Sequence, residues 1–247
     1  MSKPSILPLE LDNVTYAVSG KPLVRDVSVS LAKDTRTIIL GPNGAGKSLL
    51  LRLCHGLIAP SAGKIRWQGK SDQNPAHHQA MVFQRPVMLR RSAAANIAYV
   101  LALHRIPKAE RKDLIDEALA LAGLSDLANR PARVLSAGEQ QKLALARAWV
   151  TKPQVLFLDE PTASIDPAAT YAVENTIETI HAHGTKIIMT THDLGQARRL
   201  ADEVLFFHQG RMIEQTPART FFGQPKSALG QAFLRGELLW QEDGDAN

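Results

Sequence analysis

Residues 41–48, GPNGAGKS, have the types and spacing most directly suited to chemistry. They match the pattern G-x-x-x-x-G-K-[ST], with an apolar run before them and a helical pattern after them. Glycines let such a loop turn its backbone N–H groups around an oxyanion, and the helix start adds positive potential. Lys47 can reach the β- and γ-phosphates of a nucleotide, and the Ser48 hydroxyl can bind Mg²⁺. The predicted phosphate-binding residues are Gly41, Pro42, Asn43, Gly44, Ala45, Gly46, Lys47, Ser48 and Leu49.

A second group of polar residues follows the apolar run VLFL at residues 155–158. Such a strand ends at the carboxyl edge of an α/β sheet, where ligands bind. Asp159 is therefore predicted to hold Mg²⁺, and Glu160 to act as a general base or to orient water. The alternative is that both acids only cap the following turn. His192 follows another apolar run, KIIMT, and is predicted to join the same edge as a catalytic residue, whereas Asp193 is predicted to cap the next helix.

Residues 135–149, LSAGEQQKLALARAW, predict an amphipathic helix that begins after Ser136. Ser136 is the predicted N-cap, and Glu139 three residues later completes the pattern of a capping box. Gly138 lies in the first turn of this helix, where glycine costs up to ~1 kcal/mol relative to alanine. It is either a tolerated defect or a place where something approaches the backbone closely.

The elements that must position these residues are short apolar strands alternating with helices. Residues 9–16 and 23–31 predict an antiparallel pair joined by a turn at residues 19–22. Further strands are predicted at residues 35–40, 63–68, 80–84, 155–158, 186–190, 204–208 and 211–215. Helices are predicted at residues 46–57, 92–104, 108–122, 137–150, 167–182 and 194–200. This alternation predicts a mostly parallel sheet covered on both faces.

Composition limits the classes of protein that remain. The chain has 247 residues, 45% hydrophobic and 21% charged, as in an ordinary globular protein. Its longest uncharged run, residues 92–103, is too short to cross a bilayer, and no signal-peptide pattern is expected at the N-terminus. The single cysteine, Cys54, is predicted to be buried and excludes an internal disulfide. The net charge of +5 is dispersed and does not by itself indicate a membrane or nucleic-acid partner.

Together these motifs resemble those of the ATP-binding cassette (ABC) ATPases, over about residues 9–215. They stand in the family's order: GPNGAGKS, VFQ at 82–84, LSAGEQ at 135–140, VLFLDE at 155–160, SID at 164–166 and TH at 191–192. The phosphate loop alone would also suit kinases and GTPases. The stretch LSAGEQ between that loop and the acidic pair singles out the ABC family.

The resemblance implies an α/β fold of the P-loop NTPase (RecA-like) type, with a mostly parallel core and an N-terminal antiparallel β-subdomain. Residues 1–247 would form a single ABC ATPase domain. Residues 1–84 and 151–215 would form the β-subdomain and the nucleotide-binding core. Residues 85–150 would form an inserted helical subdomain, and residues 216–247 a C-terminal helix and a frayed tail.

The resemblance also implies that two cassettes sandwich ATP head to tail. The residues that would reach the ATP held by the other copy are Ser136, Ala137, Gly138, Glu139 and Asp166. Gly138 would then permit the close approach, and Ser136 would supply a hydroxyl. The commonest form of this signature is LSGGQ, from which the chain departs at Ala137 and Glu139.

Three further positions match the family and also have plainer interpretations. Tyr16 would stack on adenine, or else pack on its sheet. Gln84 would contact Mg²⁺ and link to the membrane partner, or else cap its strand. Asp166 would communicate across the dimer, or else cap the helix that begins at Pro167.

A lone cassette of this length resembles the ATP-hydrolysing subunit of a bacterial importer. The implied assembly contains Mg²⁺ as cofactor, a homodimer of cassettes, separate transmembrane permease subunits and, indirectly, an extracytoplasmic solute-binding protein. No nucleic-acid partner is expected. The implied location is cytoplasmic, peripheral on the cytoplasmic face of the bacterial inner membrane. Residues 85–97, RPVMLRRSAAANI, would form the permease-docking groove, or else pack under the helical block.

The identity of the transported solute is suggested only by the resemblance to particular groups within the family. Residues 84–99 and 135–149 look most like the cassettes of oxyanion importers, tungstate first and phosphate behind. Import of a polar amino acid is an alternative. A soluble, non-transport ABC ATPase of the iron–sulfur assembly or DNA-repair type is the alternative from another class.

Overall fold

The central sheet runs in the order β5-β6-β7-β3-β8-β9 in the computed structural model, which describes residues 5–69, 74–163 and 165–237. Its strands are β3 (Thr37–Leu40), β5 (Gln79–Val82), β6 (Val155–Asp159), β7 (Lys186–Thr191), β8 (Glu203–His208) and β9 (Arg211–Pro217). Neighbouring strands pair in parallel, except that β9 runs antiparallel to β8. The predicted mostly parallel α/β fold is confirmed.

Both faces of this sheet are buried, which explains its unbroken apolar strands. Successive residues of a strand point to opposite faces. Val155 and Phe157 accordingly belong to one hydrophobic cluster, whereas Leu156 and Leu158 belong to the other. In β6 the first polar side chain is therefore the last residue of the strand, Asp159, whereas the edge strand β9 carries Glu214 and Thr216 along its length.

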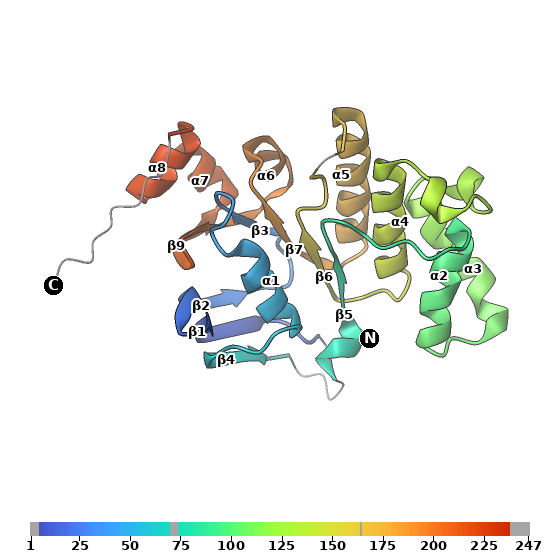
Figure 1. The fold of residues 1–247 in the computed structure, drawn as a ribbon, viewed down its shortest axis with the longest axis horizontal. Helices are drawn as coiled ribbons and strands as arrows, with labels where there is room; N and C mark the ends of the chain where they lie inside the picture. Colours follow the sequence, from blue (N-terminus) through green and yellow to red (C-terminus); the bar gives the residue numbers. More distant parts are fainter. Residues whose placement is uncertain (1–4, 70–73, 164, 238–247) are drawn as a thin grey trace.

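One face of the sheet is covered by helix α1 (Lys47–His55) and a small antiparallel sheet, as Figure 1 shows. The order of this sheet is β2-β1-β4, with β1 at Leu9–Val18, β2 at Lys21–Leu31 and β4 at Ala62–Trp67. The predicted turn between β1 and β2 is present at Ser19 and Gly20, both with positive φ. Helix α1 packs between the two sheets through Leu50, Leu51 and Leu53.

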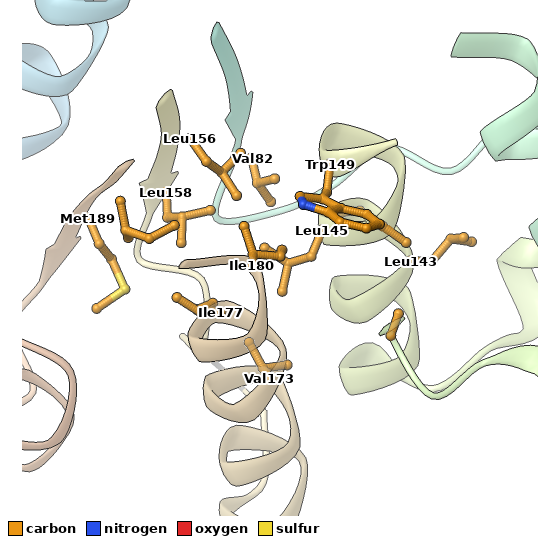
Figure 2. Close-up of a cluster of buried hydrophobic side chains, with 14 of the residues drawn as sticks. Val82, Leu143, Leu145, Trp149, Leu156, Leu158, Val173, Ile177, Ile180 and Met189 are labelled. Atoms are coloured by element: carbon orange, nitrogen blue, oxygen red, sulfur yellow. The ribbon is translucent and has the colours of Figure 1, made fainter. Parts of the chain in front are cut away.

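The remaining helices are α2 (Ala93–Leu103), α3 (Lys108–Leu121), α4 (Ala137–Trp149), α5 (Pro167–Ala182), α6 (Leu194–Leu200), α7 (Ala218–Gly223) and α8 (Ala228–Leu234). The other face is covered by four of them, α4 to α7, while α2 and α3 pack against α4 and α8 packs against β9. Three 3-10 turns lie at Pro75–His78, Ser125–Leu127 and Ala132–Val134. Figure 2 shows Trp149 of α4 and Ile177 and Ile180 of α5 gathered against Leu156 and Leu158. This packing fixes the helical block to the sheet.

Most differences from the predicted elements lie at their ends, but two short helices stand where one C-terminal helix was expected. The predicted strand at residues 35–40 begins at Thr37, because Arg36 forms a bidentate pair with Asp202 at 3.0 and 2.9 Å. After β9 the chain forms two short helices, α7 and α8, and Phe206 contacts Phe221 and Phe233 there. The predicted frayed tail lies outside the described residues, apart from Glu237.

None of the helices in the described ranges is long and apolar enough to span a bilayer.

The burial of Cys54 yields a prediction about its reactivity. The residue is 2% exposed on α1, and burial raises the pKa of its thiol to about 12. Thiolate is the reactive form of cysteine. We therefore expect no reaction with an aromatic disulfide reagent in the native state and one thiol per chain after denaturation in guanidinium, measured by absorbance. Rapid reaction of the native protein would contradict the buried placement.

Candidate active site

Four strand ends meet at the carboxyl edge of the central sheet. The phosphate loop follows β3, Gln84 follows β5, Asp159 and Glu160 end β6, and His192 follows β7. Beside them opens a cleft of about 710 Å³. Its lining residues are Asn43, Gly44, Ala45, Gly46, Lys47, Ser48, Leu49, Gln84, Glu160, Thr162, Ala163, Thr191, His192 and Asp193. Residues as far apart in the sequence as Asn43 and Asp193 are thus brought to one place.

The loop before α1 has the backbone geometry of an anion site. Gly46 is the N-cap of α1 with φ 101, a left-handed conformation, and no side chain caps this helix start. The first N–H groups of a helix have no partner within the helix, so they remain for an anionic ligand. Gly41 is needed for a different reason, because a Cβ there would lie 2.0 Å from the carbonyl oxygen of Phe207.

Lys47 is the buried cation of the cleft. Its Nζ donates to the carbonyl oxygens of Gly41 and Pro42, both at 2.9 Å, and lies 3.6 Å from Oε1 of Glu160. Burial lowers the pKa of Lys47, and the carboxylate of Glu160 offsets part of that effect. A buried ammonium whose charge is offset by the carboxylates of Glu160 and, more weakly, Asp159 can still bind a strongly anionic ligand.

Asp159 is oriented by two hydroxyl groups. Its Oδ1 accepts hydrogen bonds from Ser48 Oγ at 2.6 Å and from Thr190 Oγ1 at 2.8 Å, and Arg52 Nη2 lies 3.9 Å from Oδ2. Hydroxyl, carboxylate and amide oxygens are the ligands that Mg²⁺ prefers. Within the described ranges no three His, Cys, Asp or Glu residues gather into a metal site. The donors present therefore suit a magnesium ion that is also held by a phosphate.

Glu160 and His192, the two residues predicted to be catalytic, lie side by side in the cleft. Oε2 of Glu160 lies 3.2 Å from Nδ1 of His192. The backbone of Glu160 has φ 44, which is uncommon for a residue other than glycine. Its N–H donates to both the carbonyl and the hydroxyl of Thr190, at 3.2 and 3.0 Å. A carboxylate held in this way beside a histidine can take a proton from water.

The predicted signature segment does not line this cleft. Ser136 is the N-cap of α4, and both bonds of the predicted capping box are present. Glu139 N–H donates to Ser136 Oγ at 3.3 Å, and Ser136 N–H donates to Glu139 Oε2 at 2.7 Å. The latter bond lowers the pKa of Glu139. Ser136 and Ala137 are exposed, so this helix start is open to a partner.

Gly138 is buried for a reason that the sequence did not reveal. A Cβ at this position would lie 2.5 Å from Cβ of Ala169 in α5. Asp166 caps α5 by accepting a hydrogen bond from Ala169 N–H at 2.9 Å. The close approach inferred from this glycine therefore exists within the chain, between α4 and α5.

Tyr16 lies apart from the other predicted site residues. It pairs with Val24 across β1 and β2, is half-buried, and packs against the hydrophobic cluster between the two sheets. It does not line the 710 Å³ cleft.

Two threonines near the site were missed by the sequence reasoning. Thr190 bonds Asp159 and Glu160, and Thr162 lines the cleft two residues after Glu160. Threonine is common in strands and turns, so a threonine at these positions does not by itself indicate a functional site. Thr190 reaches Asp159 because the register of β6 and β7 places these two residues opposite each other. The register of paired strands cannot be read from the sequence.

The fold and this cleft define a P-loop nucleotide hydrolase with an inserted helical block. The sequence model of the ABC transporter family matches residues 24–163, so the chain belongs to that family. It is an ATP-binding subunit and an ATPase.

Relatives in other organisms carry several solute names. The phosphate import ATP-binding protein PstB of Thermotoga maritima is 33% identical over 247 residues, covering 93% of this chain and 98% of that protein. The tungstate uptake ATP-binding protein TupC of Peptoclostridium acidaminophilum is 35% identical over 209 residues, covering 84% and 98%. The methionine import ATP-binding protein MetN of Brucella abortus is 35% identical over 237 residues, covering 92% and 64%. The chain is thus an importer-type ATP-binding subunit.

A solved structure agrees with this placement. CbiO1 of Clostridium perfringens, part of the ABC transporter complex CbiONQ, has a TM-score of 0.80 and 27% identity. The similarity covers 94% of this chain and 96% of that one.

The contact between Gly138 and Ala169 can be tested by stability. Gly138→Ala forces the two Cβ atoms apart, and overpacking of this kind costs ~1–3 kcal/mol, more than the helix propensity that alanine gains. We expect a lower Tm for Gly138→Ala and recovery of most of the loss in the double variant Gly138→Ala/Ala169→Gly, measured by thermal denaturation. A Gly138→Ala protein as stable as the wild type would argue against the packing described.

Proposed function

We propose that this ATPase energises import of a small oxyanion such as tungstate, using Mg-ATP bound between two head-to-tail copies. The observation that carries the ATP chemistry is the convergence of the phosphate loop, Asp159, Glu160 and His192 on one cleft. Tungstate is favoured over methionine because the two relatives are equally identical to this chain, at 35%, but the match spans 98% of the tungstate uptake subunit and only 64% of the methionine import subunit.

In this proposal the phosphate loop binds the nucleotide, and Lys47 holds its β- and γ-phosphates. Ser48, Gln84 and Asp159 hold Mg²⁺, which when bound neutralises developing charge on the phosphates. Glu160 acts as the general base toward the attacking water, and His192 orients the Glu160 carboxylate. Tyr16 stacks on the adenine from β1, the middle strand of the small sheet.

A second copy completes the site. The exposed cap at Ser136 and Ala137 does not reach the cleft of its own chain, and a helix start offers N–H groups to a phosphate. We assign Ser136, Ala137, Gly138 and Glu139 to the γ-phosphate held by the partner copy, with Asp166 beside them. We also propose that residues 85–150 form the helical subdomain that carries this segment, and that residues 1–84 and 151–215 form the β-subdomain and the nucleotide-binding core.

The permease-docking surface lies beside β5. A second cavity of about 370 Å³ is lined there by Met81, Phe83, Pro86, Val87 and Arg147, among others. Val87 is 74% exposed and Phe83 44% exposed, whereas Met88 is buried. An exposed apolar surface of this kind suits a partner protein.

The loop at this surface is firmly held. Arg147 Nη1 donates to the Val87 carbonyl at 2.9 Å, and Leu89 N–H donates to Oδ1 of the buried Asn96 at 3.0 Å. Within the apolar run at residues 86–89, Met88 therefore packs in the core while Val87 is exposed to solvent. The proposed location is the cytoplasmic face of the bacterial inner membrane, below a separate permease that receives solute from an extracytoplasmic binding protein.

Phosphate is the second candidate solute, favoured by the 33% identity to the phosphate import subunit over 93% of this chain. Both candidates are tetrahedral oxyanions, and the residues of this cleft bind ATP and not the solute.

The role of Glu160 is tested by Glu160→Gln, which keeps the shape and removes the base. We expect ATP hydrolysis to fall at least ~10²-fold while ATP affinity is retained, because only the proton transfer is lost. Steady-state phosphate release and equilibrium binding of a fluorescent nucleotide measure the two effects. The trapped variant should also dimerise in ATP by sedimentation. Turnover at the wild-type rate would show that another group is the base.

The partner is tested by capturing tagged Glu160→Gln protein with ATP from detergent-solubilised membranes of the source cells, followed by mass spectrometry. We expect a polytopic permease whose recovery falls in Val87→Asp, a variant at the exposed docking surface. Gel filtration of that variant checks its folding. Recovery of only soluble proteins or nucleic acid would favour a non-transport ABC ATPase.

A further inference from the structure

A buried polar network lies behind the wall of the cleft and joins three separate segments. Gln196 of α6 is fully buried, and its Nε2 donates to Thr162 Oγ1 at 2.7 Å and to Glu174 Oε1 at 3.2 Å. Arg199, almost one turn further along α6, donates from Nε and Nη2 to the two oxygens of Glu174, both at 2.7 Å. The network therefore ties the loop after Glu160 to α5 and to α6.

The orientation of the Gln196 amide is set by its partners. A carboxylate only accepts hydrogen bonds, so the amide nitrogen and not the oxygen must face Glu174. Both hydrogens on Nε2 are then used, by Glu174 and Thr162. The amide Oε1 is buried and has no hydrogen-bond partner in the described part of the chain. Buried polar atoms without a partner are uncommon in native proteins and cost free energy. The amide nevertheless keeps this orientation, because it is the one in which Nε2 can donate to both Thr162 and Glu174.

Glu174 is the fixed point of the network. Its side chain is only 4% exposed, and a buried carboxylate requires compensating donors. Arg199 supplies them in a planar, two-bond arrangement that restricts the carboxylate in both position and rotation. Because Oε1 of Glu174 cannot turn away, the Gln196 amide is held in one place.

Gln196 connects the segments that carry Glu160 and His192. Its backbone N–H donates to Oδ1 of Asp193 at 3.0 Å, and Asp193 directly follows His192. Its side chain holds Thr162, two residues after Glu160. Gln196 therefore forms hydrogen bonds with Thr162, near Glu160, and with Asp193, beside His192. It does not itself line the cleft.

We propose that Gln196, oriented by Glu174 and Arg199, is a positioning residue that keeps Glu160 and His192 in their 3.2 Å contact. The inference rests on the roles proposed above for these two residues. Glu160 has a backbone conformation that residues other than glycine rarely adopt, so its loop needs restraint from outside. Thr190 restrains the loop at Glu160 N–H, and Gln196 restrains it at Thr162.

The test is Gln196→Met in the full chain, which keeps the length of the side chain and removes both hydrogen bonds of Nε2. We expect kcat for ATP hydrolysis to fall ~10-fold or more, since small displacements of catalytic groups have effects of this size. The Kd for Mg-ATP should stay within about twofold of wild type, because the phosphate loop is untouched. Arg199→Met should shift kcat in the same direction.

Arg36→Met is the matched control for a general loss of stability. Arg36 forms a bidentate pair with Asp202 at the opposite edge of the sheet, with bonds of 3.0 and 2.9 Å. We expect Arg36→Met and Arg199→Met to lower Tm to a similar extent, and only Arg199→Met to lower kcat. An equal fall of kcat in both variants would mean that the network is merely structural and would overturn the inference.

A double-mutant cycle with Thr162→Val completes the test. If Gln196 acts through Thr162, Gln196→Met should change kcat little further in the Thr162→Val background. Fully additive effects, or a normal kcat in Gln196→Met beside an inactive Glu160→Gln, would refute the inference and leave the proposed function standing. Normal turnover in Glu160→Gln would instead remove the proposed base and this inference with it.

Discussion

The structure depends on a sheet that is buried on both faces. Because Val155 and Phe157 face one hydrophobic cluster while Leu156 and Leu158 face the other, the strand itself has no room for polar side chains. The first place where they are accommodated is its carboxyl end, at Asp159 and Glu160. The same constraint applies to β3 and β7, which pair in parallel beside each other. Burial of the strands thereby gathers the reactive groups at one edge.

The helices that cover this sheet also connect the parts of the site. Helices α4 and α5 approach each other so closely at Gly138 that only a glycine fits opposite Ala169. The exposed cap at Ser136 and the cap at Asp166 are consequently held on adjoining helices. Loss of activity on substitution of Gly138 would therefore not by itself prove contact with a nucleotide, because the same substitution disturbs this packing.

The order and type of the elements could be read from the sequence because apolar runs, caps and glycines act locally. The capping box at Ser136 and the N-cap at Asp166 are examples, since both depend on residues three apart. What could not be read depends on pairing between distant segments. The bond from Thr190 to Asp159 requires the register of two strands, and the contact of Gly138 with Ala169 requires the packing of two helices. Glutamine and arginine on α6 would ordinarily be assigned to a solvated surface, so the partners of Glu174 carried no signal either.

The contact between Lys47 and Glu160 links two parts of the site. The Lys47 ammonium lies 3.6 Å from the Glu160 carboxylate, and the two side chains are only 4% and 14% exposed. Little water screens two such largely buried groups, so the attraction between their charges is stronger than on an open surface. A phosphate that enters the loop competes for the same ammonium and weakens its hold on Glu160. The phosphate loop and the end of β6 are thus coupled through one ammonium, so that a charge bound at the first is felt by the carboxylate at the second.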